Sequence, residues 1–196
     1  PVTHTAHNEA QVNNIAPNRR IIGLDGRVVS QRGSSSHRPD HHRYPEGLID
    51  PMLKTVAFYN GRKKLAACHY YACHPMSYYG DGRVSADFCG LARRQRREHE
   101  PECAHLYFNG CGGNIGAGKY NDGSKEMRPV LTRRILNGIV ASEEGLEPQP
   151  IESVRWETHD ILPPVDQRFD EDAILRHISD RSQSVTNRNR PAYTVA

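Results

Sequence analysis

A histidine that ends an apolar strand is the first residue of this sequence that could do chemistry. Residues 64–73 are almost continuously apolar or aromatic, and the run stops at His74-Pro75. A histidine at such a junction can bind a metal or act as a general base, because the strand is rigid and the following loop is open. The alternative is that His74 packs and hydrogen-bonds at the strand end without any catalytic role.

Two further segments could contact a substrate. Asn18-Arg19-Arg20 lies in a predicted loop, where arginine offers a planar set of donors to a carboxylate, a phosphate or a polarised carbonyl; a solvated basic pair is the alternative. Residues 109–118 contain five glycines, and backbone N–H groups at such a turn favour anions. This loop lacks the G-K-[ST] ending of a P-loop and does not fit G-x-G-x-x-G, so nucleotide binding stays a third hypothesis.

The cysteines and the N-terminal histidines fit structural roles better than catalytic ones. Five cysteines form no C-x-x-C pair, which favours free buried thiols over a disulfide or a metal site. The histidines before residue 43 lie in polar, loop-like sequence, and we expect them at the surface. These two sets are Cys68, Cys73, Cys89, Cys103 and Cys111, and His4, His7, His37, His41 and His42.

The elements that must position these residues follow from periodicity and turn signals. Asn60-Gly61 predicts a hairpin between strands at 53–59 and 64–73, the second covered on both faces. Asp87 is predicted to cap a basic helix over 88–100, and a second helix covers 125–141. Further strands are expected at 28–29, 105–108 and 151–161, and a small helix at 170–180. This order predicts an α/β fold, a layered mixed β-sheet with flanking helices.

Composition limits the classes of partner. The 196 residues carry a net charge of +3, which is too small to indicate a nucleic-acid partner, and no run approaches the roughly 18 apolar residues of a transmembrane segment. The sequence starts without a methionine or the features of a signal peptide and ends directly after a helical segment. We therefore interpret residues 1–196 as a single partial domain that belongs to a larger catalytic domain.

Five motifs, taken in order, resemble one family: the neutral/alkaline (non-lysosomal) ceramidases, in their N-terminal catalytic domain. The resemblance covers about residues 10–140 of the chain. The motifs are Asn18-Arg19-Arg20, residues 49–54, residues 71–77 around His74-Pro75, residues 85–90, and residues 108–114 in the glycine-rich loop.

The resemblance implies a zinc-dependent amidase that splits an N-acyl sphingoid amide. His74 would be one zinc ligand, and Arg19 would contact the reacting amide. The glycine-rich loop would line the substrate through Gly112, Gly113, Asn114 and Gly116. The other ligands of the family, an upstream His-x-His segment and a downstream Glu and Tyr, do not map onto this chain, because His4 and His7 lie too close to Asn18.

Gly116 stands where the family has a serine that is important for activity. A serine nucleophile is excluded at this position, whereas attack by metal-activated water stays possible. The sequence therefore predicts a fragment of a diverged zinc-dependent hydrolase that acts on an amide or ester bond of a small, lipid-like substrate. Its site would need the rest of the parent polypeptide. The alternative is a non-catalytic ceramidase-like scaffold that binds a ligand or partner. Family members are often exported or membrane-associated, which leaves the compartment of this chain open.

Overall fold

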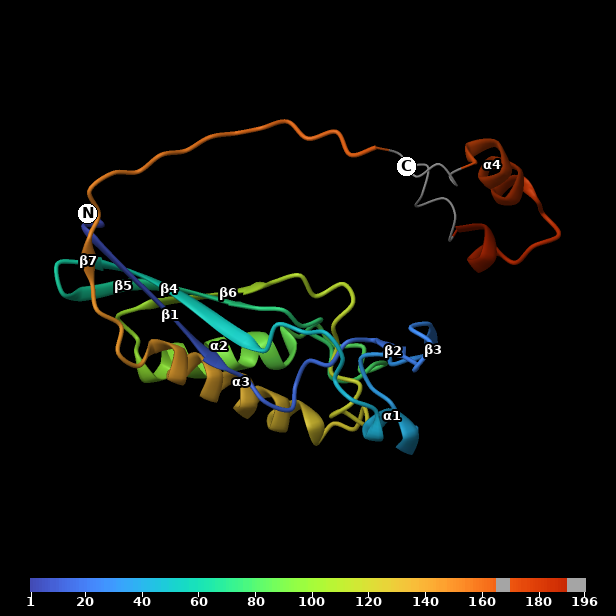
Figure 1. Cartoon of the computed structure of the whole chain (residues 1–196), viewed down its shortest axis with the longest axis horizontal. Coiled ribbons are helices and arrows are strands. Elements are labelled where there is room, and N and C mark those ends of the chain that lie inside the picture. Colours follow the sequence, from blue (N-terminus) through green and yellow to red (C-terminus); the bar gives the residue numbers. More distant parts are fainter. Residues whose placement is uncertain (165–169, 190–196) are drawn as a thin grey trace. The chain divides into compact units, whose positions relative to one another are not determined.

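The predicted hairpin forms the centre of a five-stranded sheet with the order β6-β5-β4-β1-β7 (Figure 1). β4 pairs antiparallel with both β5 and β1, whereas β5 and β6 run parallel, so the sheet is mixed as the sequence predicted. The strands are β1 (His4–Gln11), β4 (Met52–Asn60), β5 (Lys63–Tyr71), β6 (Ala104–Asn109) and β7 (Gln149–Pro150).

The computed structural model describes residues 1–164 and 170–189. The chain forms two units: Pro1–Ser153, which contains the sheet, and Val154–Ala196. In the described part of the second unit, helix α4 (Glu171–Ser179) agrees with the predicted small helix, and Asp170 caps it by accepting a hydrogen bond from the Ala173 N–H at 2.8 Å. Among the described residues, no helix is both long and apolar enough to cross a bilayer.

Helices α2 (Asp87–His99) and α3 (Met127–Glu143) cover one face of the sheet (Figure 1). The alternation of β4 turns every second side chain toward them, and these four side chains (Leu53, Thr55, Ala57 and Tyr59) are all buried. The core between sheet and helices contains Leu53, Tyr71, Phe88, Leu131, Ile135 and Ile139. Burial of this apolar surface is what holds the two layers together.

The opposite face of the sheet carries apolar side chains that no helix of the first unit covers. Tyr70 and Phe108 stack there with ring centroids 4.9 Å apart, and each keeps about two fifths of its surface exposed, 39% and 41%. The prediction that strand 64–73 is covered on both faces is therefore wrong for this unit. Its nearly continuous apolar run reflects one buried face and one face of half-exposed residues.

Two strand predictions need correction. Residues 151–161 form no strand. In this part of the chain, strand pairing with β1 is limited to Gln149–Pro150, which precede the predicted strand. Val154 and Trp156 are 84% and 88% exposed, because strand propensity has no effect without a neighbouring strand to pair with. Conversely, β1 pairs along its whole length with β4, although its sequence, HTAHNEAQ, shows no clear apolar alternation.

Smaller elements gather at one end of the sheet, next to the glycine-rich loop (Figure 1). The predicted short strand at 28–29 is β3 (Val28–Gln31), which pairs with β2 (Arg20–Ile22), and residues expected in a loop form the short helix α1 (Pro39–Arg43). At α2, Ala86 is the N-cap residue, and Asp87 is the first helical residue rather than the cap.

All five cysteines are free, as the sequence favoured, but the expectation that they are buried is wrong for Cys111 and holds only in part for Cys68, which is half-buried. Cys73, Cys89 and Cys103 are buried, whereas Cys111 is exposed. Burial raises the pKa of the Cys89 thiol to about 12. These buried thiols therefore remain protonated at neutral pH and act as small apolar side chains.

The glycine-rich loop presses against the loop at residue 33. A Cβ atom on Gly118 would lie 2.4 Å from the backbone oxygen of Gly33, closer than any real contact, whereas a Cβ atom on Gly113 would meet nothing within 4 Å. Glycine at position 118 is thus required by the close approach of two backbones.

We expect Gly118→Ala to lower the free energy of unfolding by about 2–3 kcal/mol, because a backbone must move to make room for the methyl group. Gly113→Ala, in the same loop, should change it by less than about 0.5 kcal/mol. Urea unfolding followed by circular dichroism measures both values. Equal stability of the two variants would contradict this view of the contact between the loops.

Candidate functional site

Backbone pairing brings three segments of the predicted site together at one end of the sheet. Ile115 forms an antiparallel bridge with Asn18, and Gly116 forms a parallel bridge with His74. The His74 N–H donates to the Ile115 carbonyl at 3.1 Å, and the Gly116 N–H donates to the Pro17 carbonyl at 3.2 Å. The loop therefore lies between the other two segments and fixes both. We call Arg19, His74 and Gly116 the His74–Arg19 site.

Arg19 lies directly over Gly116. A Cβ atom on Gly116 would be 3.0 Å from Arg19 Nε and 3.2 Å from Nη2, so the guanidinium occupies space that any side chain at position 116 would compete for. Nη2 donates to Ser34 Oγ at 3.1 Å. Nε is buried and has no hydrogen-bond partner among the described residues. An unpaired buried donor is costly and is a natural place for an acceptor oxygen of a ligand.

His74 is half-buried, and the Arg19 guanidinium is near enough to affect its charge. Burial lowers the pKa of His74, and the Arg19 guanidinium lowers it further. The imidazole is thus neutral at physiological pH and keeps the lone pair that a metal ligand or a general base requires.

The glycine-rich loop leaves few backbone N–H groups free to bind an anion. The N–H of Gly112 donates to the Gly110 carbonyl at 2.6 Å, and the Gly116 N–H is used as described above. Asn114 instead connects segments: its Nδ2 donates to Asn18 Oδ1 at 2.7 Å, and its carbonyl accepts from the Arg19 N–H at 2.8 Å. Of the predicted loop residues, Asn114 and Gly116 contact the Asn18–Arg19 segment, while Gly112 packs against Cys73.

A buried arginine that the sequence analysis did not single out holds the Asn18–Arg19 segment from behind. Arg32 is 2% exposed, and its N–H donates to the Arg19 carbonyl at 2.8 Å. Its Nη1 donates to the Asn18 carbonyl at 3.1 Å, and its Nε and Nη2 donate to three backbone carbonyls in and after α1. It has no carboxylate partner among the described residues. Only the five-donor guanidinium can satisfy so many carbonyls at once.

The expectation of surface histidines before residue 43 is wrong for His41. It is 4% exposed, and its two ring nitrogens lie 2.9 Å from Ser36 Oγ and 3.0 Å from Ser30 Oγ. Burial lowers its pKa. His41 therefore packs α1 against β3 as a neutral side chain.

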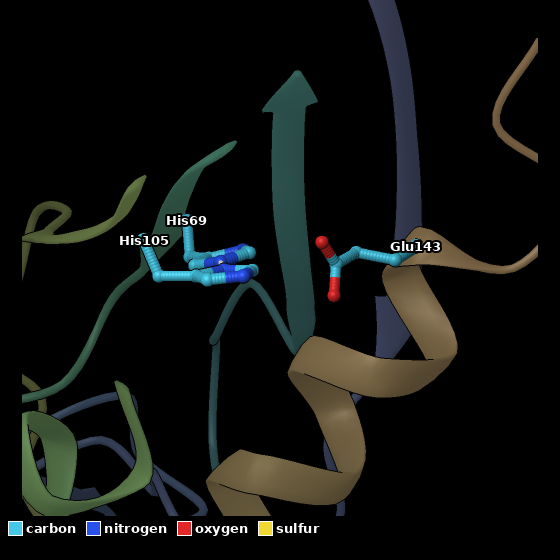
Figure 2. Close-up of side chains that lie close together, drawn as sticks. All are labelled: His69, His105 and Glu143. Atoms are coloured by element: carbon cyan, nitrogen blue, oxygen red, sulfur yellow. Dashed lines mark hydrogen bonds between the residues drawn. The ribbon is translucent and has the colours of Figure 1, made fainter. Parts of the chain in front are cut away.

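A second polar cluster, also absent from the sequence analysis, lies between the sheet and the ends of α2 and α3. His69 of β5 and His105 of β6 stack side by side, and Glu143 of α3 points toward them (Figure 2). The ligand atoms of His69, His105 and Glu143 lie within 4.8 Å of one another, as do those of Glu100, Cys103 and His105. Both groups have the donor types that hold metals.

Ion pairs already neutralise the acids of this cluster. Lys64 lies 2.8 Å from Glu100 and 2.9 Å from Glu143, and Arg96 lies 2.6 Å and 2.5 Å from the same two carboxylates. Two cations and two anions balance in a largely buried place. A divalent ion would have to displace Lys64 and Arg96, so the cluster acts as a closed structural network.

The hydrogen bonds of the cluster indicate which ring nitrogens of its two histidines carry a proton. Glu100, held by two cations, accepts from His105 Nε2 at 3.2 Å. Burial lowers the pKa of His105, so its ring is neutral at physiological pH and Nδ1 accepts from His69 Nε2 at 3.0 Å, while His69 Nδ1 accepts from Thr55 Oγ1 at 2.8 Å. Ser142 Oγ completes the chain 2.6 Å from Thr55. Both rings are neutral in this arrangement, which agrees with the pKa of His69, lowered by burial to about 4.

The signal that could have located this cluster was available in the strand pattern. His69 and Thr55 face each other across β4 and β5 and occupy inward positions of their strands. Glu100 and Glu143 lie near the ends of the two helices that cover this face. The strand pattern alone, however, does not reveal that both helices end next to the same pair of strands, so it could not place Glu100 and Glu143 beside the histidines.

The comparisons with known proteins concern the fold. No protein-family model and no curated protein sequence matches the chain significantly. Among solved structures, it resembles a ceramidase complexed with C2, with a TM-score of 0.52, 16% identity, and coverage of 73% of this chain and 22% of the other. The chain has a ceramidase-like fold.

A second ceramidase-like match is the neutral ceramidase from Pseudomonas aeruginosa, with a TM-score of 0.51, 18% identity, and coverage of 73% of this chain and 23% of the other. The chain therefore spans less than a quarter of the length of each of these proteins. At such low identity the matches establish the fold, and the family named from the five motifs agrees with it.

We expect the free energy of unfolding to fall between pH 7 and pH 5. His69 and His105 have lowered pKa values in the folded state, whereas unfolded imidazole titrates near 6.5. The unfolded chain thus binds more protons in this range, and His69 alone should cost about 2 kcal/mol at pH 5. The lowered pKa of Glu143 acts only below its ordinary value of 4.5. Denaturant unfolding at several pH values measures the effect.

His7→Gln provides the control, because His7 is an exposed histidine of β1 on the same sheet. This variant should show the same pH profile as the unaltered protein. A free energy of unfolding that stays constant from pH 7 to pH 5 would show that the two buried histidines are not neutral in the folded state.

Proposed function

We propose that this chain is part of a ceramidase-like zinc-dependent hydrolase that cleaves an amide (N-acyl) or ester bond with metal-activated water. The observation that supports it best is the convergence of Arg19, His74 and Gly116 from three separate segments. Arg19 and His74 lie in motifs of the family, Gly116 follows the glycine-rich motif, and the fold is ceramidase-like. The proposal includes three points: that the metal is zinc, that the bond is an amide or ester, and that residues 1–196 form one partial domain.

The site offers one ligand of a zinc centre, the His74 imidazole. His74 is neutral because its pKa is lowered by burial, so a ring nitrogen can bind a metal without first losing a proton. A catalytic zinc ion has three protein ligands, so other parts of the parent polypeptide must supply the rest. Zinc, when bound, would supply Lewis-acid activation of water and of the carbonyl group.

Arg19 would bind the carbonyl oxygen of the substrate. Its Nε–H has no acceptor among the described residues, and Ser34 Oγ accepts from Nη2 and so holds the guanidinium in place. A fixed donor of this kind stabilises negative charge that develops on the oxygen during attack, because it needs no reorganisation. The absence of a side chain on Gly116 leaves the arginine in this place.

A non-catalytic scaffold is the second candidate, and Gly116 is the observation that favours it. The family serine is absent, so the same unpaired Arg19 donor could bind the carboxylate or carbonyl of a ligand without hydrolysis. Absence of bound metal in the full-length protein, together with binding of a simple carboxylate such as acetate or octanoate that Arg19→Gln abolishes, would support this candidate.

We expect the full-length protein to contain about one zinc ion per chain and the His74→Ala variant to lose it, because His74 is a direct ligand. Elemental analysis of purified protein measures the metal, and release of fatty acid from an N-acyl amide measures hydrolysis. His7→Ala, which changes an exposed histidine of β1, is the matched control and should keep both properties. A His74→Ala protein with its zinc and hydrolysis intact would refute the proposal.

A further inference from the structure

The backbone pairing described above leaves the side chains of the His74–Arg19 site to be fixed by other contacts. Asn121 provides one that reaches both sides. Its side chain is completely buried, and Nδ2 donates to the Ser34 carbonyl at 2.8 Å and to the Ser77 carbonyl at 2.7 Å. Ser34 holds Arg19 through its hydroxyl, and Ser77 follows His74 by three residues.

The amide of Asn121 is used completely. Its two Nδ2 hydrogens bind the two carbonyls, and Oδ1 accepts from the Gly123 N–H at 3.0 Å. Its own carbonyl accepts from the Ser36 N–H at 2.9 Å. Aspartate has the same shape but lacks the two donors. Asn121 therefore joins two distant segments in a way that no isosteric side chain reproduces.

The Ser77 side of this connection is itself rigid. The Ser77 N–H donates to Asp87 Oδ2 at 3.0 Å, and Arg128 Nε donates to Ser77 Oγ at 2.9 Å. Asp87 has a φ of 49°, a left-handed conformation that is strained for a residue other than glycine. The segment after His74 is thus fastened to both α2 and α3, and Asn121 extends this frame to the loop that holds Arg19.

We propose that Asn121 is a positioning residue that sets the location of the Arg19 guanidinium relative to the His74 imidazole. It acts through Ser34 and Ser77, to whose carbonyls its side chain donates. The inference rests on the proposed function in so far as these two side chains carry the reaction. Its physical content, a fixed geometry between them, is independent of catalysis.

The first test needs no activity and uses the chain of 196 residues. In Asn121→Asp, the Ser34 loop loses its anchor, so the NMR signal of the Arg19 Nε–H should shift and exchange with water at least tenfold faster. The control, Asn60→Asp, places the same change in the exposed hairpin turn and should leave that signal unchanged. An Arg19 signal that is identical in Asn121→Asp and the unaltered protein would overturn the inference.

The second test uses kinetics of the full-length enzyme. A geometry change should lower kcat by about 10- to 100-fold and alter KM much less. Ser34→Ala removes only the hydroxyl that holds Arg19, and it should cause a similar loss of kcat without lowering Tm. This variant also serves if Asn121→Asp does not fold.

The two changes should be less than additive, because both loosen Arg19 through residue 34, whereas only Asn121→Asp also affects the Ser77 side. In the Ser34→Ala background, Asn121→Asp should therefore lower kcat by a smaller factor than in the unaltered enzyme, whereas independent, multiplied losses would overturn the inference. If the unaltered enzyme hydrolyses neither amides nor esters, the proposed function fails, and the NMR comparison alone decides the role of Asn121.

Discussion

The insertion of Ile115–Gly116 between two other segments is the constraint on which the candidate site depends. The loop pairs with residue 18 on one side and residue 74 on the other, so a small displacement of the loop would move both. Such pairing demands close approach, and it is satisfied by glycines that leave room for the Arg19 guanidinium and for the neighbouring backbone. Most glycines of the loop, with the exception of Gly113, therefore have a packing cause, and the composition does not by itself indicate a phosphate site.

The first unit has two polar regions, the cluster around His69 and His105 and the His74–Arg19 site. They differ in whether their buried polar groups have hydrogen-bond partners. Beneath the sheet, two carboxylates, two cations and two neutral histidines leave no charge unpaired. Such a network specifies how β5, β6 and the helices meet. At the end of the sheet, Arg19 Nε is buried and has no hydrogen-bond partner in the part of the chain that the structure describes. Our proposal places the chemistry there, where a ligand could supply the missing acceptor.

Much of the fold follows from local patterns. The hairpin, the inward face of β4 and the helices α2, α3 and α4 are set by alternation, turn residues and apolar periodicity over a few neighbouring residues. β1 and residues 151–161 were misassigned because pairing with another strand, and not propensity, decides whether such polar or isolated segments become strands. The five ordered motifs also pointed to the ceramidase-like fold, which low overall identity to the solved structures would not have indicated.

The sequence by itself determined which residue types the candidate site could use: a histidine after a strand, an arginine in a loop, and a glycine where a serine would otherwise stand. Only the tertiary structure decided that these residues meet, that Arg32 and Asn121 hold them, and that His69 and His105 form a closed cluster elsewhere. The reason is physical. Residue type and short-range spacing fix chemistry and local conformation, whereas contacts between residues such as 34, 77 and 121 depend on how loops far apart in sequence pack at one end of the sheet.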